Sequence, residues 1–260
     1  MKAVKPKKFL GQHFLTDLSI AENIADTIQE YKNIPVLEIG PGMGVLTQFL
    51  VQKGFDLTVV ELDRDSVAYL KEAFPQLDGK IIEHDFLKLD LDKLYPGEFN
   101  VIGNYPYNIS SQIFFKVLEH KDKIPCCSGM IQKEVAERMA AGPGSKTYGI
   151  LSVLMQAWYH IEYCFTVHEH VFNPPPRVKS AVIKMTRNAT KSLDCDEKLF
   201  KAVVKTAFNQ RRKTMRNSLK PLLGKECEIF TDPIFNKRPE QLSVQEFIEL
   251  TKFVTPYVVR

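Results

Sequence analysis

The chain has 260 residues, of which 44% are hydrophobic and 25% are charged, so it can bury the core of one large globular domain and a small second one. No apolar run approaches the roughly 20 residues of a membrane-spanning helix, and the basic start of the chain lacks the apolar stretch of a secretory signal. The five cysteines show no metal-ligand spacing. We therefore expect reduced thiols, no bound metal, no membrane contact and a cytoplasmic protein.

Positive charge is concentrated in two places, although the net charge is only +4. Four lysines precede the first acidic residue, Asp17, and eight lysines and arginines but no acidic residue lie between Lys201 and Lys225. Such blocks can bind nucleic-acid phosphates, or they can be solvated surface without further function. We interpret the densest part of the second block as a phosphate-binding segment, which consists of Arg211, Arg212, Lys213 and Arg216.

Short apolar runs alternate with helical patterns from residue 33 to about residue 187. The runs at residues 34–39, 56–62, 79–85, 99–104 and 126–132 are expected to be buried strands, and those at 46–53, 66–74 and 110–119 helices. This alternation predicts a Rossmann-like α/β fold, a parallel sheet with helices on both faces. Two later runs, residues 162–169 and 180–187, are expected to close one edge as an antiparallel pair with a proline-rich loop between them.

Strand signals stop after residue 187. Helices are expected at residues 194–209, 211–223 and 243–253. We therefore predict two domains, residues 1–188 with the sheet and residues 189–260 as a small helical domain that contains the phosphate-binding segment.

A glycine-rich loop follows the first expected strand, in the order Glu38-Ile39-Gly40-Pro41-Gly42-Met43-Gly44. Glycines let the backbone turn sharply and approach a ligand closely, so Gly40 and Gly42 are candidate cofactor contacts. Dinucleotide-binding dehydrogenases use a similar loop. The spacing here is G-x-G-x-G, an acidic residue stands two before the first glycine, and no phosphate-binding lysine follows. These details favour a methyltransferase.

Two acidic residues end the next two expected strands. Glu61 can accept hydrogen bonds from both hydroxyls of a ribose, and Asp85 can accept one from the amine of an adenine. Ligands of open α/β sheets bind at these carboxyl ends of strands. Either residue alone can equally be a helix cap or a surface acid, but three functional strand ends in series favour binding.

The fourth expected strand ends in Asn104-Tyr105-Pro106-Tyr107, the most specific motif of the chain. An exocyclic amine is a poor nucleophile because its lone pair is delocalised into the ring. The Asn104 side-chain oxygen and the carbonyl before Pro106 can accept both amine hydrogens and favour a tetrahedral nitrogen. Tyr107 can stack on a base that has left its RNA stack. We therefore take Asn104, Pro106 and Tyr107 as candidate catalytic residues.

With these motifs the chain resembles the KsgA-type ribosomal RNA adenine dimethyltransferases over essentially its full length. Residues 8–15 (KFLGQHFL) resemble the family's leader, residues 171–182 (VFNPPPRVKSAV) its late loop, and residues 207–214 (AFNQRRKT) its RNA-facing segment. The resemblance implies that S-adenosylmethionine is contacted at the positions of His13, Leu15, Gly40, Glu61, Asp85 and Asn104. It also implies that Phe172 packs on the target adenine, although an aromatic residue before prolines is often a packing residue.

The resemblance further implies a function. It is the transfer of two methyl groups to each of two adjacent adenosines in a hairpin loop near the 3′ end of small-subunit rRNA, within a pre-ribosomal particle, by a monomer. Tyr105 departs from the family's usual leucine, and we expect altered packing rather than lost chemistry. The alternatives are an Erm-type large-subunit rRNA methyltransferase, which the triple proline and residues 210–219 disfavour, and a non-catalytic RNA-binding relative, which the intact motif residues disfavour.

Overall fold

The computed structural model describes residue 7 and residues 12–259. Residues 8–11 of the leader resemblance lie outside the described residues. The strands are β1 (Phe14–Leu15), β2 (Val36–Ile39), β3 (Leu57–Glu61), β4 (Ile81–Glu83), β5 (Asn100–Asn104), β6 (Cys126–Gln132), β7 (Tyr159–Val167), β8 (Phe172–Asn173) and β9 (Ser180–Arg187). The α-helices are α1 (Leu18–Asp26), α2 (Thr47–Gln52), α3 (Arg64–Ala73), α4 (Leu91–Leu94), α5 (Ser110–Glu119), α6 (Lys133–Ala140), α7 (Ile150–Gln156), α8 (Glu197–Asn209), α9 (Met215–Ser218), α10 (Lys220–Leu223) and α11 (Val244–Val254).

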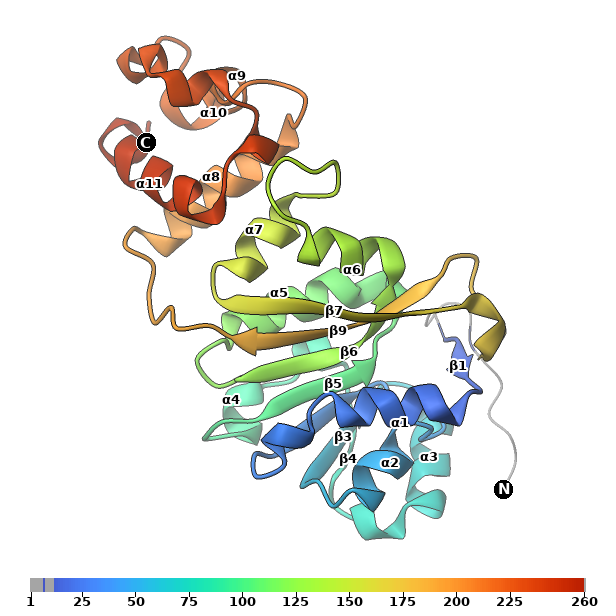
Figure 1. Ribbon diagram of the computed structural model, residues 1–260. Coiled ribbons are helices and arrows are strands. Elements are labelled where there is room, and N and C mark those ends of the chain that lie inside the picture. The colour runs from blue at the N-terminus through green and yellow to red at the C-terminus, as the bar shows by residue number, and fades with distance from the viewer. Residues whose placement is uncertain (1–6, 8–11, 260) are drawn as a thin grey trace. The chain divides into compact units, whose positions relative to one another are not determined.

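Seven strands form one sheet in the order β4-β3-β2-β5-β6-β9-β7 (Figure 1). The first five run parallel to one another, and β9 runs antiparallel to β6. The predicted α/β sheet is confirmed, with the two late strands at one edge. The chain order reverses between β2 and β5, and ligands of open α/β sheets bind at the carboxyl ends of strands at such a point.

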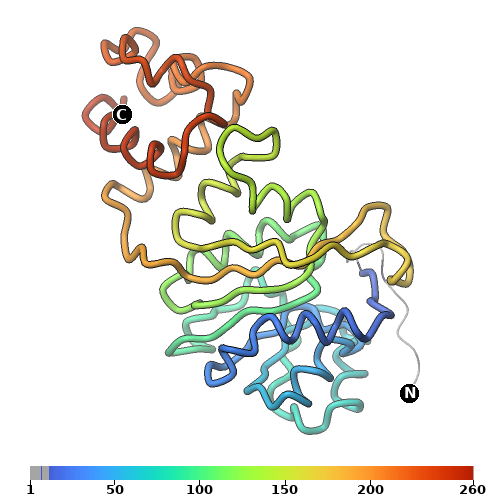
Figure 2. Tube along the Cα trace, viewed as in Figure 1, coloured from blue at the N-terminus to red at the C-terminus, as the bar shows by residue number. Residues whose placement is uncertain are grey.

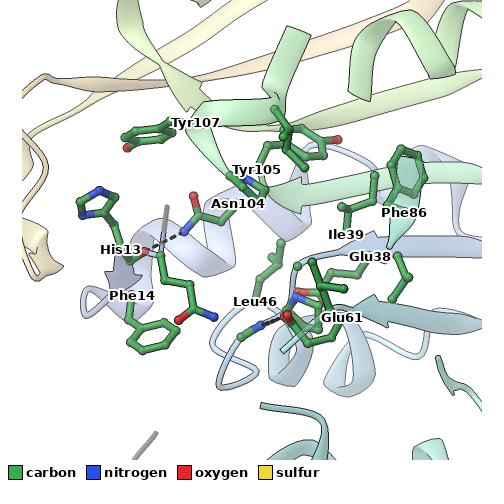
Figure 3. A pocket seen from close by; sticks show the side chains of 18 of the residues that line it. His13, Phe14, Glu38, Ile39, Leu46, Glu61, Phe86, Asn104, Tyr105 and Tyr107 are labelled. Atoms are coloured by element: carbon green, nitrogen blue, oxygen red, sulfur yellow. Dashed lines mark hydrogen bonds between the residues drawn. The ribbon is translucent and has the colours of Figure 1, made fainter. Parts of the chain in front are cut away.

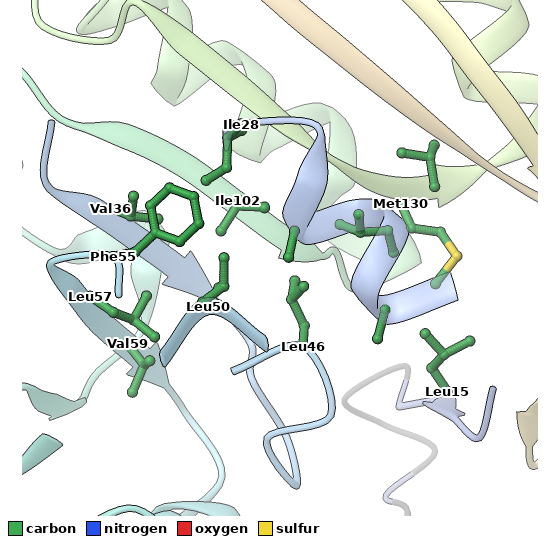
Figure 4. Packing of buried hydrophobic residues seen from close by; sticks show 14 of the residues in the cluster. Leu15, Ile28, Val36, Leu46, Leu50, Phe55, Leu57, Val59, Ile102 and Met130 are labelled. Atoms are coloured by element: carbon green, nitrogen blue, oxygen red, sulfur yellow. The ribbon is translucent and has the colours of Figure 1, made fainter. Parts of the chain in front are cut away.

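Each sheet face packs against different helices, because successive side chains of a strand point to opposite faces. Val36, Val59 and Ile102 lie in one buried hydrophobic cluster with Ile24 and Ala25 of α1 and with residues of α2 (Figure 4). The other face carries α5, where the ring of Phe114 meets that of Tyr105 edge-on at a centroid distance of 5.6 Å. The predicted coverage of both faces is therefore observed, although we did not predict α1.

The chain divides into two compact units. One contains residues 1–136 and 162–187, and the other contains residues 137–161 and 188–260; Figure 2 follows the chain through them. The second unit resumes at Asn188, where we place the domain boundary, but it also includes residues 137–161, which no pattern in the sequence separates from the sheet. A division at residue 188 stays a prediction.

One expected helix of the second unit, residues 211–223, is wrong. The structure has a turn after α8, followed by the two short helices α9 and α10. Pro221 stands at the start of α10, where its missing N–H costs nothing; inside a continuous helix it would remove a hydrogen bond. Elsewhere in this unit α11 agrees with the helix expected at residues 243–253. It begins with a capping box, in which Ser243 and Glu246 bond to each other's backbone N–H.

No helix of the described chain is long and apolar enough to span a membrane. Among residue 7 and residues 12–259, no three His, Cys, Asp or Glu side chains are grouped as a metal site requires. The expected absence of a metal stays a prediction.

Candidate active site

A cavity of about 210 Å³ lies at the carboxyl ends of β2, β3, β4 and β5 in the first unit (Figure 3). It is at the reversal point of the chain order, between β2 and β5. Nine of the predicted site residues line it, although they come from five separate segments of the sequence. They are His13, Leu15, Gly40, Gly42, Glu61, Asp85, Asn104, Pro106 and Tyr107.

The glycine-rich loop between β2 and α2 forms one wall. Gly42 has a positive φ of 55°, a conformation that residues with a Cβ rarely adopt. A Cβ there would also lie 3.0 Å from the ring of Phe14. The Gly42 N–H donates to Glu61 Oε2 over 3.0 Å. This hydrogen bond joins the glycine-rich loop to the end of β3, so the two can contact the same ligand.

Glu61 is 6% exposed and accepts two main-chain hydrogen bonds, the second from the Asp63 N–H to Oε1 at 2.8 Å. Burial raises its pKa, and the hydrogen bonds from Asp63 and Gly42 oppose that rise. Asp85 is more open, with a side chain 29% exposed. Its Oδ1 accepts from the Leu87 N–H over 2.9 Å, so it caps the 3₁₀ turn Phe86–Lys88 and lines the cavity at the same time.

Glu38 is the third carboxylate of the cavity wall. It is 1% exposed, and the Thr47 hydroxyl donates to its Oε2 over 2.7 Å. Burial raises the pKa of Glu38 to about 8, with a smaller contribution from the charge of Glu61. No lysine or arginine is among the described residues that line the cavity. A cavity with three acidic side chains and no such cation disfavours the pyrophosphate of a dinucleotide.

The shifted pKa of Glu38 predicts a pH-dependent stability. In the unfolded chain Glu38 ionises near its usual pKa of 4.5, whereas in the folded protein it ionises near 8. Its contribution to stability is therefore full below pH 4.5 and is lost as the pH rises to about 8. Glu38→Gln removes this loss. The free energy of unfolding of the variant minus that of the wild type, from denaturant titrations, should grow from pH 5 to pH 8; a constant difference would contradict the prediction.

Asn104 is the last residue of β5, and His13 orients its side-chain amide. Its Nδ2 donates to the His13 carbonyl over 3.4 Å, which leaves the Oδ1 as the group that faces away from that carbonyl. Neither Asn104 Oδ1 nor the Tyr105 carbonyl accepts a hydrogen bond from any of the described residues. Two acceptors, one side-chain and one main-chain, are therefore available side by side in sequence at the cavity.

Tyr105 itself is fixed below the cavity. Its ring is 1% exposed, and its hydroxyl donates to the Ser128 carbonyl over 2.7 Å. The ring lies against two glycines, since a Cβ on Gly103 or Gly129 would come within 3.1 or 2.7 Å of it. The main-chain N–H of Tyr105 donates to Met130 at 3.0 Å. The side chain therefore packs between β5 and β6, and the carbonyl remains at the cavity.

Tyr107 is held by contacts that the sequence did not reveal. His13 stacks on its ring at a centroid distance of 5.5 Å and an interplanar angle of 26°, and its hydroxyl bonds to the Ser180 hydroxyl. The His13 Nδ1 lies 2.8 Å from the Pro174 carbonyl. Because a carbonyl only accepts, this Nδ1 carries the proton and donates. The late loop thus orients His13 and Tyr107 together.

Phe172 does not line the cavity. It is 4% exposed, lies in the buried hydrophobic cluster and belongs to β8, which pairs with β1 opposite Leu15. The structure thus places its ring in packing, the alternative role that the sequence allowed. Contact with a target adenine would require this ring to move, and it stays a prediction.

The four candidate phosphate-binding residues lie in the second unit. Arg211 donates to the Ser145 carbonyl over 3.1 Å, and Arg216 to a main-chain carbonyl 14 residues further along over 2.7 Å. The side chains of Arg212 and Lys213 are exposed, and neither makes a hydrogen bond or an ion pair within the described part of the chain. Arg212 and Lys213 are therefore the residues most available to a phosphate.

The strand order, the acidic glycine-rich loop and the cavity at the strand ends define a Rossmann-like class I methyltransferase. The sequence model of the family described as ribosomal RNA adenine dimethylase matches residues 3–255. The chain therefore belongs to this family, whose methyl donor is S-adenosylmethionine.

Relatives and solved structures are similar over nearly the whole chain. Proteins named ribosomal RNA small subunit methyltransferase A are 74% identical in Parabacteroides distasonis (96% of this chain, 94% of the relative) and 60% identical in Flavobacterium johnsoniae (97% of each). A dimethyladenosine transferase from Plasmodium falciparum has the same fold, with a TM-score of 0.76 at 24% identity over 94% of this chain and 98% of that one. The 23S rRNA methyltransferase ErmE gives 0.67 at 26% identity over 92% and 99%.

Proposed function

We propose that this enzyme uses S-adenosylmethionine to dimethylate the exocyclic amines of two adjacent adenosines in a hairpin loop near the 3′ end of small-subunit rRNA. The substrate would be a pre-ribosomal particle, and the enzyme would act as a monomer in the cytoplasm. Relatives with 60–74% identity and the small-subunit name support this target over the large subunit. The single observation that carries the chemistry is the pair of available acceptors, Asn104 Oδ1 and the Tyr105 carbonyl.

The residues of the cavity fit the methyl donor. S-adenosylmethionine supplies an electrophilic methyl group on a positively charged sulfur. Glu61 is a buried carboxylate, and no lysine or arginine is among the described residues that line the cavity, so a cationic ligand would relieve its cost of burial. Glu61 would accept hydrogen bonds from the ribose hydroxyls, Asp85 from the adenine amine, and the leader residues His13 and Leu15 would cover the ligand.

The catalytic contribution of the protein is then positioning and electrostatic. Asn104 Oδ1 and the Tyr105 carbonyl would accept the two hydrogens of the target amine, which localises its lone pair on nitrogen. Pro106 follows directly and leaves no N–H to compete at that turn. Tyr107, held by His13 and Ser180, would stack on the target base.

The exposed cations of the second unit would contact rRNA phosphates. Arg211 and Arg216 already donate hydrogen bonds within the protein, so replacing them would also remove structural contacts. Replacing Arg212 and Lys213 therefore tests RNA binding more cleanly. The double variant Arg212→Ala/Lys213→Ala should bind small-subunit rRNA more weakly, and its log–log salt slope should fall by about 0.7–0.9 per lost contact.

The matched control is Lys71→Ala/Lys93→Ala, which removes the same charge from exposed positions of the first unit. Filter-binding titrations from low to high salt measure both slopes. Equal slopes for the two double variants would show that Arg212 and Lys213 contribute only general charge.

Transfer of labelled methyl groups tests the proposed target. Small and large ribosomal subunits from cells that lack this modification are incubated separately with the enzyme and labelled S-adenosylmethionine. We expect label in the small-subunit rRNA. Label in the large-subunit rRNA instead would favour the Erm-type alternative, and no label in either would favour the non-catalytic one.

A further inference from the structure

Lys116 of α5 makes an unusual set of contacts beneath the cavity. Its ammonium donates to the carbonyls of Phe86, Leu87 and Leu89 at 2.8, 3.0 and 2.5 Å. A lysine ammonium has three N–H donors, so the three carbonyls account for all of them. The ammonium also lies 5.2 Å from the centroid of the Phe86 ring, within the range of a cation–π contact.

These carbonyls belong to the segment that follows β4. Asp85 caps the N-terminus of its 3₁₀ turn through the Leu87 N–H, and Lys116 binds the carbonyls at its other end. Asp85, Phe86 and Leu87 all line the cavity. Phe86 is 4% exposed, so its buried ring forms part of the cavity wall.

Lys116 lies on the helix that directly follows the Asn104–Tyr107 motif. Helix α5 begins at Ser110, after the turn that contains Tyr107, so Lys116 lies under two turns into the helix that leaves the amine-binding segment. The helix thereby joins two walls of the cavity, one at the end of β4 and one at the end of β5. Burial lowers the pKa of Lys116, while the charges of Glu119, Asp85 and Asp90 oppose this.

We propose that Lys116 is a positioning residue for the nucleobase end of the methyl donor, acting through Asp85 and Phe86. The inference rests on the proposed placement of the adenine at Asp85. Without the ammonium, the partly buried carbonyls of Leu87 and Leu89 lose the donor that Lys116 supplies, and the Phe86 carbonyl keeps only the Leu89 N–H, so the end of the turn loses the contacts that hold it. The carboxylate that reads the adenine amine and the ring beside it would then lose their fixed orientation.

The test compares two ligands that differ at the edge of the base that Asp85 would bind. S-adenosylhomocysteine has the exocyclic amine and a bare N1, and S-inosylhomocysteine has a carbonyl oxygen in place of the amine and a hydrogen on N1. Calorimetry should show that the wild type binds the adenine compound more tightly. Lys116→Met, which keeps the length of the side chain and removes its donors, should weaken binding of the adenine compound by about tenfold and reduce the ratio of the two affinities.

Lys123→Met is the matched control. Lys123 is also partly buried, and its ammonium binds Asp92 at 2.6 Å and the Tyr95 carbonyl at 3.2 Å, but unlike Phe86 and Leu87 these two partners do not line the cavity. This variant should keep the wild-type ratio. If Lys116→Met folds poorly, Lys116→Gln, which retains two N–H donors, should give a ratio between those of the wild type and a full loss.

The outcomes distinguish a failure of the adenine placement from a failure of the role of Lys116. A wild type that does not discriminate between the ligands overturns the placement of adenine at Asp85, and the role of Lys116 with it. A wild type that discriminates, with folded Lys116 variants that keep its ratio, overturns the role of Lys116 alone. A reduced ratio in Lys116→Met and an unchanged one in Lys123→Met is the result that we expect.

Discussion

Asn104→Ala should lower the rate of methyl transfer by about 100-fold or more, the scale of removing a preorganised polar group from a transition state. The Asn104 Oδ1 is the side-chain acceptor of the pair at the cavity, and His13 holds the amide in the orientation that presents it. Its hydrogen bond to the target amine should strengthen as the nitrogen becomes tetrahedral. Single-turnover rates at saturating S-adenosylmethionine measure this effect separately from any loss of cofactor affinity.

Two comparisons sharpen this result. Asn104→Asp keeps an acceptor and should retain more activity than Asn104→Ala. Binding of pre-ribosomal particles should be nearly unchanged in both variants, because phosphate contacts elsewhere supply most of that affinity. Turnover of Asn104→Ala within a few-fold of the wild type would show that Asn104 is not a catalytic group.

Glu61→Ala should weaken binding of S-adenosylmethionine by roughly 30- to 1,000-fold, the equivalent of about 2–4 kcal/mol for two charge-assisted hydrogen bonds. The carboxylate lies at the end of β3 and holds the Gly42 and Asp63 N–H groups, so its loss also frees the glycine-rich loop. Binding of rRNA without cofactor should not change. Calorimetric titration measures the first effect.

Glu61→Gln distinguishes the two contributions of this carboxylate. The glutamine keeps the shape and one acceptor oxygen, but the NH2 group that replaces the second oxygen cannot accept a hydrogen bond from an N–H. We expect an affinity between those of the wild type and Glu61→Ala. Wild-type affinity in the alanine variant would remove Glu61 from the binding site altogether.

The sequence predicted those parts of the fold that depend on short stretches. The bounds of α5, β6 and β9 agree with the expected runs, because each is a continuous apolar or helical pattern with clear ends. The carboxyl ends of parallel strands meet at one edge of the sheet, so Glu61, Asp85 and Asn104 were expected to converge, and they do line one cavity.

The contacts that orient these residues could not be predicted in the same way. His13 and Pro174 are 161 residues apart in sequence, Tyr107 and Ser180 are 73 apart, and Lys116 and Phe86 are 30 apart. No local pattern encodes such pairs, since each depends on the packing of whole elements. The packing of Phe172 also depends on distant elements: its strand β8 pairs with β1, and its ring lies in the hydrophobic cluster.

The decisive measurement is the identity of the modified nucleoside. It shows whether the enzyme methylates the exocyclic amine of adenosine, which the two acceptors at the cavity would bind. Small ribosomal subunits that lack the modification are incubated with the enzyme and S-adenosylmethionine carrying a deuterated methyl group, and the digested rRNA is analysed by mass spectrometry. We expect adenosine with two deuterated methyl groups on its exocyclic nitrogen, and almost none with Asn104→Ala. Methyl groups on a ribose hydroxyl or on another base would contradict it.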